Sequence, residues 1–69
     1  MPLNMVNDGE DFLIKKVSGK EETRRFLENL GFVAGAKISV VSRICGNVIV
    51  LIKDSRIAIS SEMAQKVIV

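Results

Sequence analysis

Residues 25–40 read RFLENLGFVAGAKISV, and the spacing of the apolar side chains changes partway along this stretch. The first six residues place Phe26 and Leu30 one helical turn apart, whereas Ile38 and Val40 alternate with polar neighbours as in a half-buried strand. Gly31 stands where a helix C-cap is expected, because glycine adopts the left-handed conformation at little steric cost. The stretch therefore predicts a helix, a short connection and a strand.

The helix is expected over residues 19–30, with an apolar stripe that also includes Leu27. Ser18 and Glu21 have the Ser-x-x-Glu spacing of a capping box, in which each side chain satisfies a backbone amide of the first helical turn. Two ion pairs are expected between residues four apart, each contributing a few tenths of a kcal/mol. These pairs are Glu21–Arg25 and Arg24–Glu28.

Most of the remaining chain reads as short strands separated by turn residues. Strands are expected at residues 11–17, 36–44, 48–53, 56–60 and 67–69, and the apolar opening Leu3, Met5 and Val6 reads as an edge strand or extended arm. Turns are expected at residues 7–10, at Gly46-Asn47 and at Asp54-Ser55. Ser60 is expected to cap a helical turn over residues 60–65.

This order of elements predicts a mainly β fold in one domain, residues 1–69. Several short strands with tight turns favour a small closed sheet, because closure removes the exposed strand edges that invite aggregation. We therefore expect an SH3-like β-barrel of about five strands, with one inserted α-helix and a short helical turn before the last strand.

Composition excludes several classes of function. The chain of 69 residues has no His, and its one Cys has no imidazole to activate it, so we expect no enzymatic activity. No apolar run approaches the length of a membrane span, and the N-terminus lacks a secretory signal. A single Cys forms no internal disulfide, which favours the cytoplasm. The net charge of +2 and the few aromatic residues argue against nucleic-acid binding.

The motif Leu30-Gly31-Phe32-x-x-Gly35-x-x-Ile38-x-Val40, following an Arg-rich helix, resembles the FeoA family of ferrous iron transport proteins. The resemblance extends over essentially the whole chain. Its structural positions are Gly31, Gly35, Gly46, Ala58 and Ala64. Three positions depart from the family pattern: Ala34 and Asn47 stand where the family has proline, and Met63 stands where it has an acidic residue.

The resemblance implies a small, non-enzymatic cytosolic partner of FeoB, a membrane transporter of ferrous iron with a cytosolic GTP-binding domain. The expected contact is with that domain or with the membrane part of the transporter, without insertion of this chain into the bilayer. A similar SH3-like module forms the C-terminal domain of iron-dependent repressors. The alternative is therefore a regulatory module that senses or binds a transition metal. A monomer or weak homo-oligomer is expected.

Candidate site residues follow from exposure and charge. Arg24, Arg25, Phe32 and Val33 are the candidates for partner binding, although Phe32 is equally compatible with capping the end of the barrel. The interleaved Glu residues also fit a solvated, salt-bridged helix face. Asp8, Glu10 and Cys45 are weak candidates for metal binding, because carboxylates and a thiolate are iron ligands. Cys45 reads more simply as a small, partly buried hydrophobe, and no cofactor beyond transient Fe²⁺ is expected.

Overall fold

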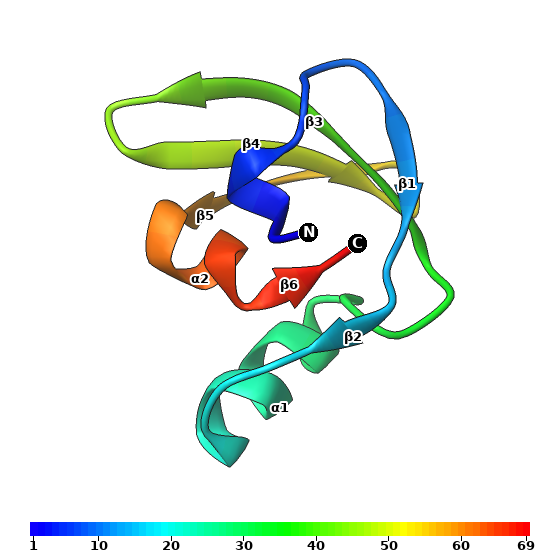
Figure 1. Cartoon of the computed structure of the whole chain (residues 1–69), viewed down its shortest axis with the longest axis vertical. Coiled ribbons are helices and arrows are strands. Elements are labelled where there is room, and N and C mark those ends of the chain that lie inside the picture. The colour runs from blue at the N-terminus through cyan, green and yellow to red at the C-terminus, as the bar shows by residue number, and fades with distance from the viewer.

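The computed structural model describes residues 1–69, the whole chain. Its elements are the 3-10 helix η1 (Leu3–Met5), strands β1 (Asp11–Leu13) and β2 (Lys16–Val17), helix α1 (Glu21–Asn29), strands β3 (Lys37–Ile44), β4 (Asn47–Ile52) and β5 (Ser55–Ser60), helix α2 (Ser61–Gln65) and strand β6 (Val67–Ile68). The fold is mainly β, as the sequence predicts, with one long helix inserted between the second and third strands (Figure 1).

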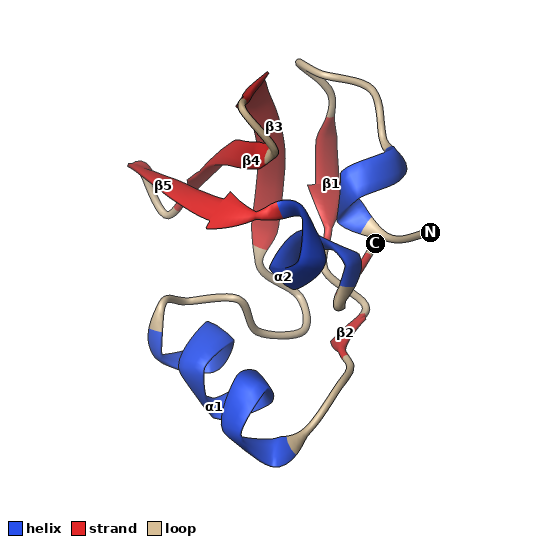
Figure 2. Ribbon diagram, turned by 90° about the vertical axis from the view of Figure 1, so that its left-hand side faces the viewer, coloured by secondary structure: helices blue, strands red, loops and turns tan.

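The strands form two antiparallel sheets. The larger sheet has the order β1-β3-β4-β5, and the smaller one pairs β2 with β6. Strand β4 lies inside the larger sheet, and its residues Val48, Val50 and Ile52 point alternately into the core. Figure 2 shows β5 at one edge of the larger sheet, with α2 following it directly.

The strand predicted at residues 11–17 is split between the two sheets. Phe12 pairs with Ile38 in the larger sheet, whereas Lys16 pairs with Ile68 in the smaller one. Ile14 lies between them, is 2% exposed and donates its amide to the Ala36 carbonyl at 2.9 Å. The chain therefore changes partners at Ile14, which gives six strands where about five were expected.

The apolar opening is a 3-10 helix, so its interpretation as a strand or extended arm was wrong. Leu3 and Val6 are buried, whereas Met5 is 69% exposed. Residues three apart share a face of a 3-10 helix, so the spacing of Leu3 and Val6 suits this conformation. Asn4 anchors the helix by donating to the Ser61 hydroxyl at 3.4 Å.

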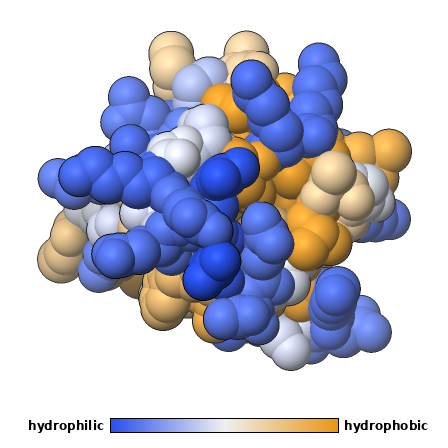
Figure 3. Space-filling view, turned by 90° about the horizontal axis from the view of Figure 1, so that it is seen from below, coloured by the Kyte–Doolittle hydropathy of each residue, from blue (hydrophilic) through white to orange (hydrophobic).

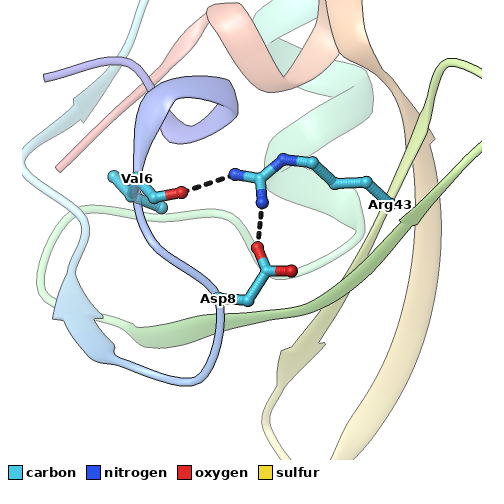
Figure 4. A network of polar contacts seen from close by, with 3 residues as sticks. All are labelled: Val6, Asp8 and Arg43. Carbon is cyan, nitrogen blue, oxygen red and sulfur yellow. Dashed lines mark hydrogen bonds and ion pairs between the residues drawn. The ribbon is translucent and has the colours of Figure 1, made fainter.

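Arg43 on β3 holds the segment after η1 (Figure 4). Its guanidinium donates to the Val6 carbonyl at 2.6 Å and also pairs with the Asp8 carboxylate. The turn predicted at residues 7–10 is present beside this network. A charge-assisted contact of this kind is stronger than a neutral hydrogen bond. It ties the first residues of the chain to the far end of a strand 35 positions later.

Helix α1 begins later than predicted, and the Ser18 capping box is wrong. Lys20 is the N-cap and makes no side-chain cap bond, whereas the Ser18 hydroxyl donates to the Lys66 carbonyl at 3.1 Å. Gly19 has φ +104° and turns the chain between Ser18 and the helix. Because of this turn, Ser18 joins the β2–β6 sheet rather than the helix.

The end of α1 agrees with the prediction. Gly31 has φ +103°, and its amide donates to the Glu28 carbonyl at 2.9 Å. The Phe32 amide donates to the Leu27 carbonyl at 3.0 Å. These two bonds make a Schellman motif, in which Phe32 and Leu27 occupy the positions that form its apolar contact. Both side chains are fully buried.

The two hairpin turns each lie one residue earlier than predicted. Cys45 and Gly46 connect β3 to β4, and Lys53 and Asp54 connect β4 to β5, with positive φ at all four residues. Two successive positive φ angles match the twist of paired strands. A register shift between Val40 and Ser42 also interrupts β3, and beyond it Ile44 is 55% exposed.

The core contains 14 buried side chains, all of them apolar. It is filled mainly by Val, Ile and Leu, together with one aromatic ring, Phe32. The last residues complete it, because Val67 and Val69 are buried. The Ser60 hydroxyl caps α2 as predicted, accepting from the Met63 amide at 3.2 Å.

Candidate partner-binding surface

Helix α1 projects from the sheets and leaves most of its surface exposed (Figures 1 and 2). Of its nine residues only Leu27 is buried. Phe26, which was placed on the predicted apolar stripe, is 53% exposed. A helix of nine residues is too short to be stable alone in water, so its attachment depends on Leu27 and the following connection.

The two arginines predicted for partner binding lie on this helix and are exposed. Arg25 pairs with Glu21 at 2.6 Å, as predicted, but both side chains are largely exposed, so the pair contributes little to stability. The predicted Arg24–Glu28 pair is not formed. The ion pairs of the structure are Glu21–Arg25, Asp11–Lys37 and Asp8–Arg43. Arg24 is therefore a free cation, and its role in binding stays a prediction.

Phe32 belongs to the core and presents no surface to a partner. Its exposure is 0%, so the structure favours the interpretation in which it packs into the end of the sheet. The Schellman motif explains this placement, because it turns the residue after Gly31 back toward Leu27. Its neighbour Val33 is 38% exposed and remains a candidate for partner contact.

A hollow of about 320 Å³ lies beside Val33. It is lined by residues 15–17, by Glu28 of α1 and by residues 32–34 of the connection that follows the helix. Lys15 and Lys16 are exposed, and neither takes part in an ion pair of the structure. We call these lining residues the basic hollow.

Figure 3 views the molecule from the α1 side and shows hydrophobic residues gathered next to hydrophilic ones. Val17, Val33 and Ala34 supply the apolar surface of the basic hollow, because Phe32, which also lines it, is fully buried. Sequence reasoning treated residues 15–17 as an ordinary strand and missed this site. The adjacent lysines Lys15 and Lys16 were the sequence feature that could have indicated this site, but the local sequence does not show which distant segment lies beside them.

The three candidate metal ligands are not brought together. Asp8 is paired with Arg43, Glu10 is exposed, and Cys45 is exposed at the tip of the β3–β4 hairpin. The interpretation of Cys45 as partly buried was wrong, because the two-residue turn projects it into solvent. No group of three or more His, Cys, Asp or Glu side chains has metal-binding geometry.

The glycines and alanines at the structural positions of the family differ in backbone conformation and in burial. Gly31, Gly35 and Gly46 all have positive φ, which favours glycine at each position. Ala64 of α2 is fully buried in the core, whereas Ala58 is exposed on the edge strand β5. None of the helices has the length and apolar composition needed to cross a bilayer.

Comparison with known sequences extends over the whole chain. Residues 1–69 match the FeoA domain family. A protein of Methanocaldococcus jannaschii that carries the provisional name Fe(2+) transport protein A is 32% identical over 68 residues, covering 99% of this chain and 83% of that protein.

Three solved structures have the same fold. An iron uptake regulatory protein, FeoA, has a TM-score of 0.88 at 25% identity, covering 97% of this chain and 91% of that one. FeoA of Stenotrophomonas maltophilia, crystallised with zinc, has a TM-score of 0.85 at 22% identity, covering 99% and 87%. A manganese-dependent transcriptional repressor has a TM-score of 0.87 at 20% identity, covering 97% of this chain and 39% of the repressor.

The fold and the exposed surface define a class of protein, the small SH3-like domain. The S. maltophilia protein is described as a prokaryotic SH3 domain protein, and the two folds superpose over nearly their whole length. The match over all 69 residues then specifies the family: this chain belongs to the FeoA domain family. The likeness to the repressor at 20% identity concerns the fold alone.

Proposed function

We propose that this chain is a non-enzymatic accessory protein of ferrous iron uptake that binds a FeoB-type, GTP-dependent transporter on its cytoplasmic side. The observation that carries the proposal is the match to the FeoA domain family over residues 1–69. The name of the M. jannaschii relative, Fe(2+) transport protein A, supports the same cargo. Fe²⁺ is the substrate of the transporter, so this chain needs no resident cofactor and meets the ion at most transiently.

The exposed part of α1 and the connection after it supply a docking surface for such a transporter. Arg24 offers an unpaired positive charge on α1, and Val33 offers an apolar contact in the connection after the helix. Charge on the rim of an interface chiefly accelerates association, whereas apolar contacts supply affinity. The chain then acts in the cytoplasm as a monomer or weak homo-oligomer, without nucleic acid and without inserting into the membrane.

A titration followed by amide NMR tests this proposal. The isolated cytosolic GTP-binding domain of the cognate transporter is added to the labelled chain with GDP and with a non-hydrolysable GTP analogue. We expect localised shifts at α1 and residues 33–35, and a weaker interaction for the Arg24→Glu variant. The matched control is Arg56→Glu, which reverses an exposed charge on β5. Absence of shifts in every nucleotide state argues against docking on this domain and directs the test to the membrane part.

The second candidate is the regulatory module that binds a transition metal, the alternative that the resemblance to iron-dependent repressors implies; the manganese-dependent repressor shares the fold of this chain. This candidate requires ligands from a partner or a second copy, since Asp8, Glu10 and Cys45 do not form a site within one chain. Addition of Mn²⁺, or of Fe²⁺ without oxygen, should then broaden or shift amides near those residues in a saturable manner. A spectrum unchanged by either metal removes the version of this candidate in which a second copy supplies the ligands.

A further inference from the structure

The basic hollow carries positive charge that no ion pair within this chain neutralises. Lys15 and Lys16 line it, and the three ion pairs of the structure involve neither of them. Glu28 is the one acidic residue of its lining, and it too forms no ion pair. The lining therefore carries two positive charges and one negative charge, and the surplus favours an anionic group.

The apolar part of the basic hollow is held in place by the backbone. Phe32 is held by the Schellman motif and is fully buried, so it fixes the connection that carries Val33 without offering surface of its own. Val33 is 38% exposed and Val17 is partly buried, so both have apolar surface that a partner can cover. Covering such surface removes it from water, which is the main favourable term in association.

The shape of the site selects among anionic partners. A bilayer accepts apolar side chains that project from a protein, whereas here the apolar surface lines a concavity. Single-stranded nucleic acid is bound by exposed aromatic rings, and the only ring here is fully buried. A volume of about 320 Å³ admits one or two side chains of an extended peptide.

We infer that the basic hollow binds an extended peptide segment that presents an apolar side chain next to a carboxylate. The apolar side chain covers Val17 and Val33, and the carboxylate pairs with Lys15 or Lys16. This inference deepens the proposed function, on which it rests, because it assigns the segment to the transporter. It also predicts that Glu28 weakens peptide binding, because its carboxylate repels the acidic peptide.

The first experiment uses synthetic peptides and does not depend on the transporter. The probe is the capped hexapeptide Gly-Glu-Leu-Glu-Val-Gly, and the control has Lys in place of both Glu residues. We expect the acidic peptide to shift the amides of residues 15–17, 28 and 32–34 with a Kd in the range of about 1 mM. The Glu28→Gln variant should bind it more tightly. Equal shifts from both peptides, or none from the acidic one, overturn the inference.

The second experiment uses the variant Lys15→Glu/Lys16→Glu with the transporter's GTP-binding domain. Both lysines are exposed, so the fold should persist, and the amide spectrum verifies this. Binding should weaken by about tenfold or more, while the control Arg56→Glu binds as the unmodified chain does. If the domain binds the double variant unchanged, the inference fails and the proposed function stands. If the domain never binds but the peptide does, docking on this domain fails, whereas recognition of an acidic peptide by the basic hollow stands.

Vesicles containing phosphatidylglycerol distinguish a lipid headgroup from a peptide carboxylate. We expect no vesicle binding that depends on Lys15 and Lys16. Vesicle binding that the double variant abolishes, without any effect of the acidic peptide, would reassign the basic hollow to the membrane surface and overturn the inference.

Discussion

At the scale of single residues, Gly31 controls the junction between α1 and the sheet. Its positive φ allows the chain to reverse, and the amides of Gly31 and Phe32 then reach the last carbonyls of the helix. A β-branched residue is strongly disfavoured at such an angle. A Cβ at this position would make only an ordinary contact with the Lys53 side chain, at 3.5 Å, so the obstacle is the backbone angle and not a clash.

We therefore expect Gly31→Val to lower the free energy of unfolding by more than about 1 kcal/mol. Denaturation with urea, followed by circular dichroism, measures this change. Asn29→Ala is the control, because Asn29 is exposed in the same helix and its replacement should be nearly neutral. A midpoint for Gly31→Val equal to that of the control would contradict the role of the left-handed cap.

Phe32 provides the second test at this scale. The sequence interpretation of Phe32 as a partner-binding residue predicts that Phe32→Ser weakens binding and leaves the fold intact. Full burial now predicts unfolding, since removing a buried aromatic ring costs about 3–5 kcal/mol. A loss of that size is a large part of the stability of a small domain. Thermal denaturation checks it, and a native-like melting temperature would show that Phe32 is not a core residue.

At the scale of elements, α2 is a short helix whose start depends on one side chain. The Ser60 hydroxyl accepts from the Met63 amide, and Ala64 then places the helix against the core. Local sequence predicted this cap correctly but misplaced the cap of α1. The difference lies in Gly19, whose positive φ separates Ser18 from its helix, whereas Ser60 has ordinary extended angles directly before α2.

Ser60→Ala should therefore reduce the stability by about 1 kcal/mol, because a helix amide loses its acceptor. Ser18→Ala is the informative comparison, since its hydroxyl bonds to the Lys66 carbonyl and not to α1. Hydrogen exchange should show faster exchange in α2 for the first variant, and between β2 and β6 for the second. Faster exchange in α1 for Ser18→Ala would instead show that Ser18 caps α1.

At the scale of the whole molecule, the two ends of the chain meet. The amino group of Met1 donates to the Val69 carbonyl at 2.8 Å, and the Val69 amide donates back to the Met1 carbonyl at 2.8 Å (Figure 1). Strand β6 pairs with β2, and the side chains of Val67 and Val69 are buried in the core. A domain this small buries only about 60% of its unfolded surface, so it has little stability to spare.

Removal of residues 67–69 should therefore abolish cooperative folding, because β2 loses its partner and the core loses two side chains. The measurement is the amide spectrum, which should collapse to the narrow dispersion of an unfolded chain. Removal of Val69 alone tests a graded effect, with a lower melting temperature and a retained fold. A dispersed spectrum after removal of all three residues would show that the larger sheet is stable by itself.

Local side chains are sufficient to predict where helix α1 ends, where α2 begins, the approximate hairpins and the order of the elements. Those features depend on backbone angles and hydrogen bonds between residues a few positions apart, which local side chains specify. Three features emerge only from the folded chain. They are the split of residues 11–17 between two sheets, the burial of Phe32, and the gathering of Lys15, Lys16, Glu28 and Val33 around one hollow. The split strand and the hollow depend on contacts between segments that are distant in the chain, which no local pattern encodes. For Phe32 the local pattern allowed two placements, and packing against the rest of the core selected one.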